Sequence, residues 1–319
     1  MRALMIAAMA ASLIPQACAN EPTANPAGPA TKDSTAKASA TATHILLTDD
    51  PFPYDRVARV DVYVVNVSVS LSPDTSSTGS FVTVATPNRR INVLALQGGD
   101  TDELGALKLP PGIITAVRLV LDTDSSSITL ADGRVLTGSS SPGIAWQSSA
   151  GRPVLNALVH EQIAVPDSGG RVVIVFDVGE AFIPVSVLDS SSTDSGFVFS
   201  PFVTAFDGTR TGAIAGIVRG TSDGGAAVTD ASLQLYLGNP TNPENTWWRV
   251  GTARSDSAGT FRFAYVTPSA HWTSTSAHAT DTYILTVDPP NGSGLGRVIV
   301  PNIEVTTGNT TSVGMVVLP

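Results

Sequence analysis

Aromatic side chains gather in one part of a sequence that is otherwise poor in them. Only 6% of the residues are Phe, Trp or Tyr, yet Trp247, Trp248, Tyr265 and Trp272 follow one another closely, with Tyr236 just before them. Exposed planar rings can stack on the apolar face of a sugar, so the first four are candidate ligand-binding residues. The alternative is that one of the two adjacent tryptophans packs in a core and the other covers a sheet edge.

Two short motifs contain residues that nucleophiles or phosphate loops use. Residues 166–170 (Pro-Asp-Ser-Gly-Gly) are similar to the segment around a serine-protease nucleophile, but a proline replaces the first glycine. No earlier His lies in a matching motif that would supply a general base. We therefore predict a hairpin turn between Val165 and Arg171. Residues 292–296 (Gly-Ser-Gly-Leu-Gly) lack a strand-to-helix setting and are predicted to be a loop.

Acidic and histidine side chains are the other candidates for catalysis or metal binding. The acids form three clusters, at Asp49, Asp50 and Asp55, at Asp100, Asp102 and Glu103, and at Asp122 and Asp124. None is a twelve-residue calcium loop, so we expect solvated turns. His271 and His278 could meet at a metal ion but are also expected to be solvated. The sequence thus predicts no metal site, no cofactor and no catalytic residue, and it leaves open a carboxylate pair that cleaves glycosides.

Charge and cysteine content exclude several classes of protein. The 319 residues include 18 basic and 27 acidic side chains, a net charge of −9. Such an acidic chain is not expected to bind a phosphate backbone, and nucleic acid is excluded as a partner. A single Cys rules out a disulfide framework and a Cys-based zinc site.

The amino terminus has the features of an export signal. Arg2 precedes an apolar run from Ala3 to Ile14, which is shorter than the roughly 20 residues of a membrane-spanning helix. A signal peptidase could cut after Ala19 and release a soluble protein. Alternatively, Cys18 could be lipidated.

The second possibility rests on a resemblance to bacterial lipoprotein signals, in which a small residue precedes an acylated Cys. Ala17 and Cys18 fit that pattern, whereas Pro15 and Gln16 depart from it. We favour a lipoprotein-type signal peptide over residues 1–18, with Cys18 as the lipidated residue. Residues 19–43 are rich in Ala, Thr, Pro and Ser and are predicted to be a disordered tether.

Residues 44–206 are predicted to form a first, β-sandwich-like domain, because short blocks of Val and Ile alternate with Gly, Pro, Asp and Ser. Val57–Leu71 should be one long strand with a bulge near Val65, or two joined strands. Asp132-Gly133 should be a tight hairpin turn. Further strands are expected at Ser80–Ala85, Ile114–Asp122, Ser127–Leu130, Arg134–Leu136, Glu161–Val165, Arg171–Asp177 and Phe197–Phe206. Helical turns are expected only at Ile91–Leu96, Asp102–Leu107 and Val154–His160.

Residues 207–319 are predicted to form a second domain, a seven-stranded β-sandwich, so that the whole protein is all-β. Its strands are expected at Gly212–Gly220, Ala231–Leu237, Trp247–Ala253, Thr260–Val266, Tyr283–Val287, Arg297–Val305 and Thr311–Leu318.

Motifs in each domain are similar to those of a known family. Leu47 to Pro51, Ile91 to Leu96, Leu109 to Gly112 and Phe199 to Pro201 occur in the order found in domain of unknown function family 4382. The first domain resembles this family, whose members are exported bacterial proteins, frequently lipid-anchored, with no established activity.

The second domain carries the glycine-containing segment 212–218, the Asp256-x-x-Gly259-x-Phe-x-Phe pattern and Tyr283-x-Leu-x-Val. It resembles the carboxypeptidase regulatory-like domain, which implies a transthyretin-like sandwich. The family's Pro-Gly before its Tyr is replaced by a longer loop over 267–282.

Together these features predict a non-enzymatic binding or adhesion module that is exported to the bacterial cell envelope. A lipid anchor would be its only link to the membrane; without one it would be periplasmic or extracellular. Its partner would be a glycan or a surface protein, and we expect the second domain to bind a neutral or cationic ligand. The alternative is an uncharacterised extracellular hydrolase, or an accessory part of one, with unidentified catalytic carboxylates.

Overall fold

A computed structural model of the chain describes residues 41–49, 56–72, 80–146, 151–159, 162–188, 196–221, 225–273 and 279–319. Residues 38–319 form one compact unit. Cys18, the rest of the predicted signal peptide, Asp50, Asp55, His160 and His278 lie outside the described residues. Among the residues that are described, no helix is long and apolar enough to cross a membrane.

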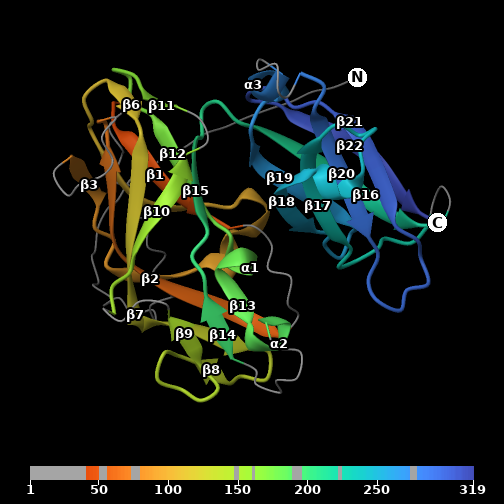
Figure 1. The fold of residues 1–319 in the computed structure, drawn as a ribbon, viewed down its shortest axis with the longest axis horizontal. Helices are drawn as coiled ribbons and strands as arrows, with labels where there is room; N and C mark the ends of the chain where they lie inside the picture. The colour runs from red at the N-terminus through yellow and green to blue at the C-terminus, as the bar shows by residue number, and fades with distance from the viewer. Residues whose placement is uncertain are drawn as a thin grey trace, which may run out of the picture. The chain divides into compact units, whose positions relative to one another are not determined.

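The protein is all-β, as predicted, and its first part is built on one ten-stranded sheet (Figure 1). Eight strands follow the order β3-β2-β7-β10-β15-β12-β1-β5, while β4 pairs with β2 and β8 with β7. These strands are β1 (Thr43–Thr48), β2 (Val57–Ser70), β3 (Phe81–Ala85), β4 (Arg89–Asn92), β5 (Asp102–Leu107), β7 (Ala116–Leu130), β8 (Val135–Leu136), β10 (Val154–Val159), β12 (Arg171–Phe176) and β15 (Val203–Asp207).

Two smaller sheets and short helices accompany the large sheet in this part of the unit. A two-stranded sheet pairs β6 with β11, and a three-stranded sheet has the order β13-β14-β9. The elements are β6 (Gly112–Ile114), β9 (Ile144–Trp146), β11 (Ile163–Val165), β13 (Phe182–Pro184), β14 (Phe197–Phe199), the 3-10 helix η1 (Val93–Gly99) and the short helices α1 (Val178–Ala181) and α2 (Val185–Leu188).

Strand β2 shows how the valine pattern becomes a core. Val60, Val62 and Val64 are buried, and the buried positions then shift by one to Val67 and Val69. The register of β2 against β7 shifts between Val64 and Asn66, so the predicted bulge is confirmed. By inserting one residue, the bulge keeps valines on the core side along all 14 residues of the strand.

The two end strands of the large sheet approach each other. A Cβ atom on Gly105 of β5 would lie 2.9 Å from the Cβ of Ala85 on β3. The sheet therefore curls over one hydrophobic core, which includes Ile45, Leu119 and Ile174. Only a residue without a side chain allows the strands to come this close at Gly105.

Several predictions for the first domain are wrong in detail. Asp102–Leu107 and the described part of Val154–His160 are strands, not helical turns. In β10, Leu155 and Ala157 are buried and their neighbours are exposed, which is the two-residue period of a strand between two partners. Segments 114–122 and 127–130 belong to one 15-residue strand, β7, whereas 197–206 is split into β14 and β15.

The turns are also partly different from expectation. Asp132-Gly133 joins the antiparallel pair β7 and β8, as predicted. Residues 166–170 do form a turn, with the amide of Gly169 donating to the carbonyl of Pro166 over 2.9 Å. However, β11 and β12 pair with strands of different sheets, so this turn is not a hairpin.

The second part of the unit has seven strands in two facing sheets, which agrees with the predicted sandwich (Figure 1). One sheet has the order β19-β16-β22 and the other β18-β17-β20-β21. The elements are β16 (Gly212–Gly220), β17 (Ser232–Gly238), η2 (Glu244–Thr246), β18 (Trp248–Arg254), β19 (Thr260–Val266), α3 (Ser269–Thr273), β20 (Thr282–Asp288), β21 (Val298–Ile303) and β22 (Thr310–Leu318). Ile214 and Val218 pack with Leu235 and Leu285 in its core. The relation to the carboxypeptidase regulatory-like family and the boundary at residue 207 stay predictions.

Candidate ligand-binding site

A cavity of about 460 Å³ lies within the compact unit and collects most of the protein's tryptophans and tyrosines. The chain has four tryptophans and five tyrosines, and six of these nine residues line the cavity: Tyr236, Trp247, Trp248, Tyr265, Trp272 and Tyr283. All four residues that the sequence analysis selected are among them. Its volume is within the usual range for small-molecule sites.

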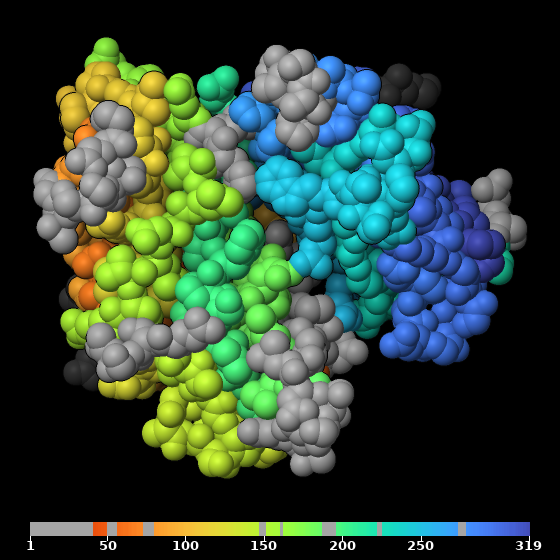
Figure 2. Space-filling view, viewed as in Figure 1, coloured from red at the N-terminus to blue at the C-terminus, as the bar shows by residue number. Residues whose placement is uncertain are grey.

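Both parts of the compact unit contribute to the walls. Strands β17 to β20 and α3 supply the aromatic residues named above, while Val175, Asp177, Glu180, Phe202, Thr204 and Phe206 come from β12, α1, β15 and the residues next to them. In the space-filling view a hollow is visible between the green atoms around β12, α1 and β15 and the cyan atoms around β18 and β19 (Figure 2). The contribution from the first domain was not predicted from the sequence.

Trp248 and Trp272 form a right-angled corner. Their ring centroids are 5.7 Å apart and the ring planes meet at 86°. Trp248 begins β18, an edge strand, and 46% of its surface is exposed. Because Trp248 borders the cavity and is not part of the core, a ligand can reach its ring.

Trp272 is fixed by hydrogen bonds that run into the core. Its Nε1 donates to the hydroxyl of Tyr283 over 2.8 Å, and that hydroxyl donates to the carbonyl of Thr267 over 2.6 Å. Tyr283 is 1% exposed, so its hydroxyl group makes these bonds away from solvent. This pairing holds the indole ring in one orientation.

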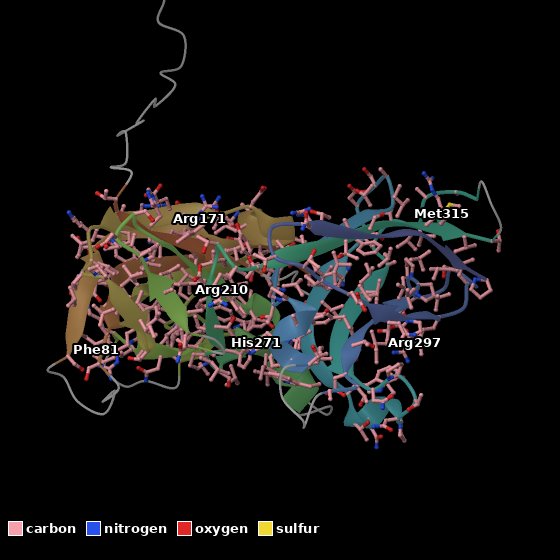
Figure 3. The ribbon with its side chains drawn as sticks, turned by 90° about the horizontal axis from the view of Figure 1, so that it is seen from above. Phe81, Arg171, Arg210, His271, Arg297 and Met315 are labelled. Carbon is pink, nitrogen blue, oxygen red and sulfur yellow. The ribbon has the colours of Figure 1, made fainter. Side chains whose placement is uncertain are left out.

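His271 precedes Trp272 on α3, and Figure 3 shows its position on this helix. Its ring lies edge-on to that of Trp272, with centroids 4.9 Å apart. Its proposed metal partner, His278, lies outside the described residues. In the part of the chain that the structure describes, no group of three His, Cys, Asp or Glu side chains could hold a metal ion.

Trp247 is positioned by the turn that precedes it. Its Nε1 donates to the carbonyl of Asn239 over 3.0 Å, and its ring lies 6.0 Å from that of Tyr236. The η2 turn is tied to the opposite loop because Arg297 pairs with Glu244 through both guanidinium nitrogens, at 3.0 and 2.5 Å. Arg297 is labelled in Figure 3. Of the alternative stated for the two adjacent tryptophans, Trp248 does lie on an edge strand, whereas Trp247 is only half-buried.

Tyr265 reaches the cavity through a backbone irregularity. Gly212 of β16 pairs with Val266 and Ile214 pairs with Phe263, so β19 has an extra residue at this point. Tyr265 takes a φ of +56°, which is costly for a residue with a bulky side chain. Bulges of this kind redirect a side chain, and here the side chain lines the cavity.

Charged groups meet on one wall of the cavity. The carboxylate of Asp177 accepts a hydrogen bond of 3.0 Å from the amide of Glu180 and so caps α1. Burial raises the pKa of Asp177 to about 6, although Arg249 and the amide of Gly179 oppose the shift. Arg249 forms an ion pair with Glu180. The Asp before Val178 signals a helix cap, but nothing local to the sequence indicates that Arg249 lies nearby.

The acidic clusters that the sequence analysis considered for calcium have structural partners instead. Asp49 is 3% exposed and accepts a hydrogen bond of 3.0 Å from the amide of Val178. Asp102 accepts two hydrogen bonds from Arg89, at 2.7 and 2.5 Å. Asp122 accepts hydrogen bonds of 3.1 Å from the amides of the two β7 residues that follow Thr123. These acids fix turns and strand ends outside the aromatic cavity.

Residues 41–199 match the family described as Domain of unknown function (DUF4382). The first domain matches the predicted family. No curated protein gives a significant match to the chain.

Three solved structures illustrate what the chain is similar to. The Bacillus anthracis TIE protein is 11% identical, with a TM-score of 0.22, over 87% of this chain and 40% of that one. A streptococcal ancillary pilin is 11% identical, with a TM-score of 0.19, over 87% and 62%. A 9R-lipoxygenase from Cyanothece is 17% identical, with a TM-score of 0.22, over 35% and 17%. The chain therefore spans less than two thirds of the length of each.

Proposed function

We propose that the protein is a binding module of the cell envelope whose ligand stacks on the aromatic side chains of the cavity, and that this ligand is a carbohydrate. The observation that carries the proposal is that six of the nine Trp and Tyr residues line one cavity. Sugar rings present apolar faces to aromatic rings and hydroxyl groups to polar side chains. Thr204, Thr252 and Asp177 supply polar atoms in the same walls.

A binding role fits the cavity better than hydrolysis does. A glycosidase needs two carboxyl groups that are free to act on the scissile bond. Here Asp177 caps α1, and Glu180 pairs with Arg249. The two carboxyl groups of this wall therefore already have structural partners.

We further propose that the protein is exported and anchored by lipid at Cys18, with residues 19–43 as the tether. Two acyl chains would anchor a protein stably, whereas one chain would not. The test is detergent phase partitioning of the wild type and of Cys18→Ser. Partitioning of only the wild type into the detergent phase supports the anchor, and equal solubility of both contradicts it.

The ligand-binding proposal is tested with the full chain on an oligosaccharide array, followed by titration of the best ligand. We expect Trp248→Ala and Trp272→Ala each to weaken binding at least about tenfold, which corresponds to roughly 1.4 kcal/mol. Met315→Ala is a matched control, because Met315 is also 46% exposed and does not line the cavity. An array without binding, or equal loss in the control, would contradict the proposal.

A further inference from the structure

The charges around the cavity are few and unevenly distributed. Among the described residues that line it, only Asp177, Glu180 and Arg249 are charged. With both carboxylates ionised, the wall carries a net charge of −1. Both acids come from the first domain, whereas the aromatic corner of Trp248 and Trp272 comes from the second.

We propose that this site selects a ligand with a permanent positive charge, a quaternary ammonium group, held between the aromatic corner and the acidic wall. The inference rests on the proposed function, since it requires that the cavity binds a ligand. It goes further by naming the charged group and by assigning a specificity role to Asp177.

The aromatic corner consists of side chains that bind such cations. The faces of aromatic rings attract cations electrostatically, tryptophan most strongly, and sets of aromatic rings are a recurrent site for quaternary ammonium groups. Trp248 and Trp272 stand at 86° to each other in a T-shaped contact, with centroids 5.7 Å apart, and both rings line the cavity. Tyr265 and Tyr283 line the same cavity.

The acidic wall disfavours a ligand that carries a negative charge. Arg249 is the one cationic residue among the described lining residues, and it is already paired with Glu180. A ligand carboxylate would therefore have to compete with Glu180 for it, next to Asp177. A cation is attracted by Asp177 and Glu180 and repelled by Arg249, and the two acids outnumber the one base in this wall.

The protonation of Asp177 gives the proposal a second observable. The charged or titratable groups beside it are Arg249 on β18, Glu180 on α1, and Asp49 after β1, which accepts a hydrogen bond from the neighbouring amide of Val178. Burial raises the pKa of Asp177 to about 6. A cation binds the ionised carboxylate more strongly, so its affinity should fall as the pH is lowered from 7.5 to 5.

The test compares two probes that differ only in charge, choline and its uncharged isostere 3,3-dimethylbutan-1-ol. Each is titrated into the full chain at pH 7.5 and pH 5 while tryptophan fluorescence is recorded. We expect choline to bind at least about tenfold more tightly at pH 7.5 and to lose most of that advantage at pH 5. The affinity of the isostere should not depend on pH.

Asp177→Asn should abolish the preference for choline at pH 7.5, because the amide oxygen still caps α1 but carries no charge. Asp256→Asn, on an exposed turn outside the cavity, is the control and should keep the preference. If Asp177→Asn does not fold, the pH dependence of choline binding by the wild type still tests the inference. Equal affinity for the two probes in the wild type would overturn the inference, as would an unchanged preference in a folded Asp177→Asn.

Neutral oligosaccharides separate this inference from the proposed function. Binding of neutral sugars without a preference for choline would overturn the charge selectivity and leave the binding function in place. If neutral sugars, choline and the isostere all fail to bind, both the charge selectivity and the proposed binding function are overturned. Sedimentation with phosphatidylcholine vesicles, with and without excess choline, would show whether a membrane headgroup can supply the cation.

Discussion

The indole nitrogen of Trp272 donates a hydrogen bond of 2.8 Å to the hydroxyl of Tyr283, which is itself buried and bonded to the carbonyl of Thr267. This relay connects an α3 residue at the edge of the cavity with the core of the second domain. Helix α3 has five residues and is too short to be stable by itself. The ring of Trp272 is held in one orientation because it is hydrogen-bonded to a residue of the core.

Tyr283→Phe should therefore affect both stability and the site. Removing the hydroxyl leaves the carbonyl of Thr267 and the indole N–H without their partner, so the free energy of unfolding should fall by about 1–2 kcal/mol. Tryptophan fluorescence should change and ligand affinity should decrease. Tyr63→Phe is the matched control, since the Tyr63 hydroxyl donates to the carbonyl of Asn88 at an exposed position. Equal effects of the two changes on stability would contradict this account.

Asp177 should make stability depend on pH in a defined direction. Its pKa is 3.8 as an ordinary aspartate and about 6 in the folded protein, so the folded state binds more protons between these values. The free energy of unfolding should then increase as the pH is lowered from 7.5 towards 4.

Asp177→Asn tests that assignment with thermal melts at pH 7.5, 6 and 5. The variant keeps the cap on α1 and should show a smaller increase in melting temperature on acidification than the wild type. In Asp256, hydrogen bonds from Thr260 lower the pKa below 3.8, so Asp256→Asn should not change the response above pH 5. A wild-type melting temperature that falls on acidification through this range would contradict the assignment.

Much of the second domain could be predicted because its sequence signals are local. The strand predicted at Gly212–Gly220 matches β16, and that at Thr260–Val266 matches β19, residue for residue. Both combine alternating apolar residues with turn residues at their ends. The gathering of Trp247, Trp248 and Trp272 at one site was also visible in the sequence, because these residues flank neighbouring strands.

The parts that were missed depend on distant residues. Strand β10 mixes small and apolar residues and becomes a strand because it pairs with β7 on one side and β15 on the other. The pairing of Glu180 with Arg249 joins residues that are far apart in the sequence. The left-handed Tyr265 carries no sequence signal, since a glycine or asparagine would be the usual residue there.

Thr48 should contribute to the stability of the first domain through its hydroxyl. Thr48 is 3% exposed, and its Oγ1 lies 3.0 Å from the carbonyl oxygen of Leu96 and 2.7 Å from that of Asp100. The residue thus ties the end of β1 to the η1 turn. Thr48→Val keeps the shape and should cost about 1–2 kcal/mol in urea unfolding. Thr246→Val is the control, because it removes an exposed hydroxyl that is bonded to the carbonyl of Pro243. It should lower the free energy of unfolding by less than about 0.5 kcal/mol, the usual limit for surface changes. Equal losses in the two variants would contradict the role of Thr48.

Gly216 lies at a point where β16 packs closely against its neighbours. A Cβ atom there would come within 2.7 Å of side-chain atoms of Phe261 and Val313 and within 2.9 Å of the carbonyl oxygen of Gly314. The side chains could shift, but the carbonyl belongs to the β22 backbone that pairs with β16, so the two strands would have to separate locally. Gly216→Ala should therefore lower the free energy of unfolding by about 1–3 kcal/mol, as overpacked substitutions do.

The matched control for this change is Gly112→Ala in β6. The nearest atom to a Cβ at Gly112 is a methyl carbon of Leu71 at 3.6 Å, an ordinary contact. Urea unfolding of both variants should give the same dependence on urea concentration as the wild type, with a lowered midpoint only for Gly216→Ala. A midpoint that is unchanged in Gly216→Ala would mean that β16 and β22 can separate without loss, and that the glycines of segment 212–218 are not required for packing.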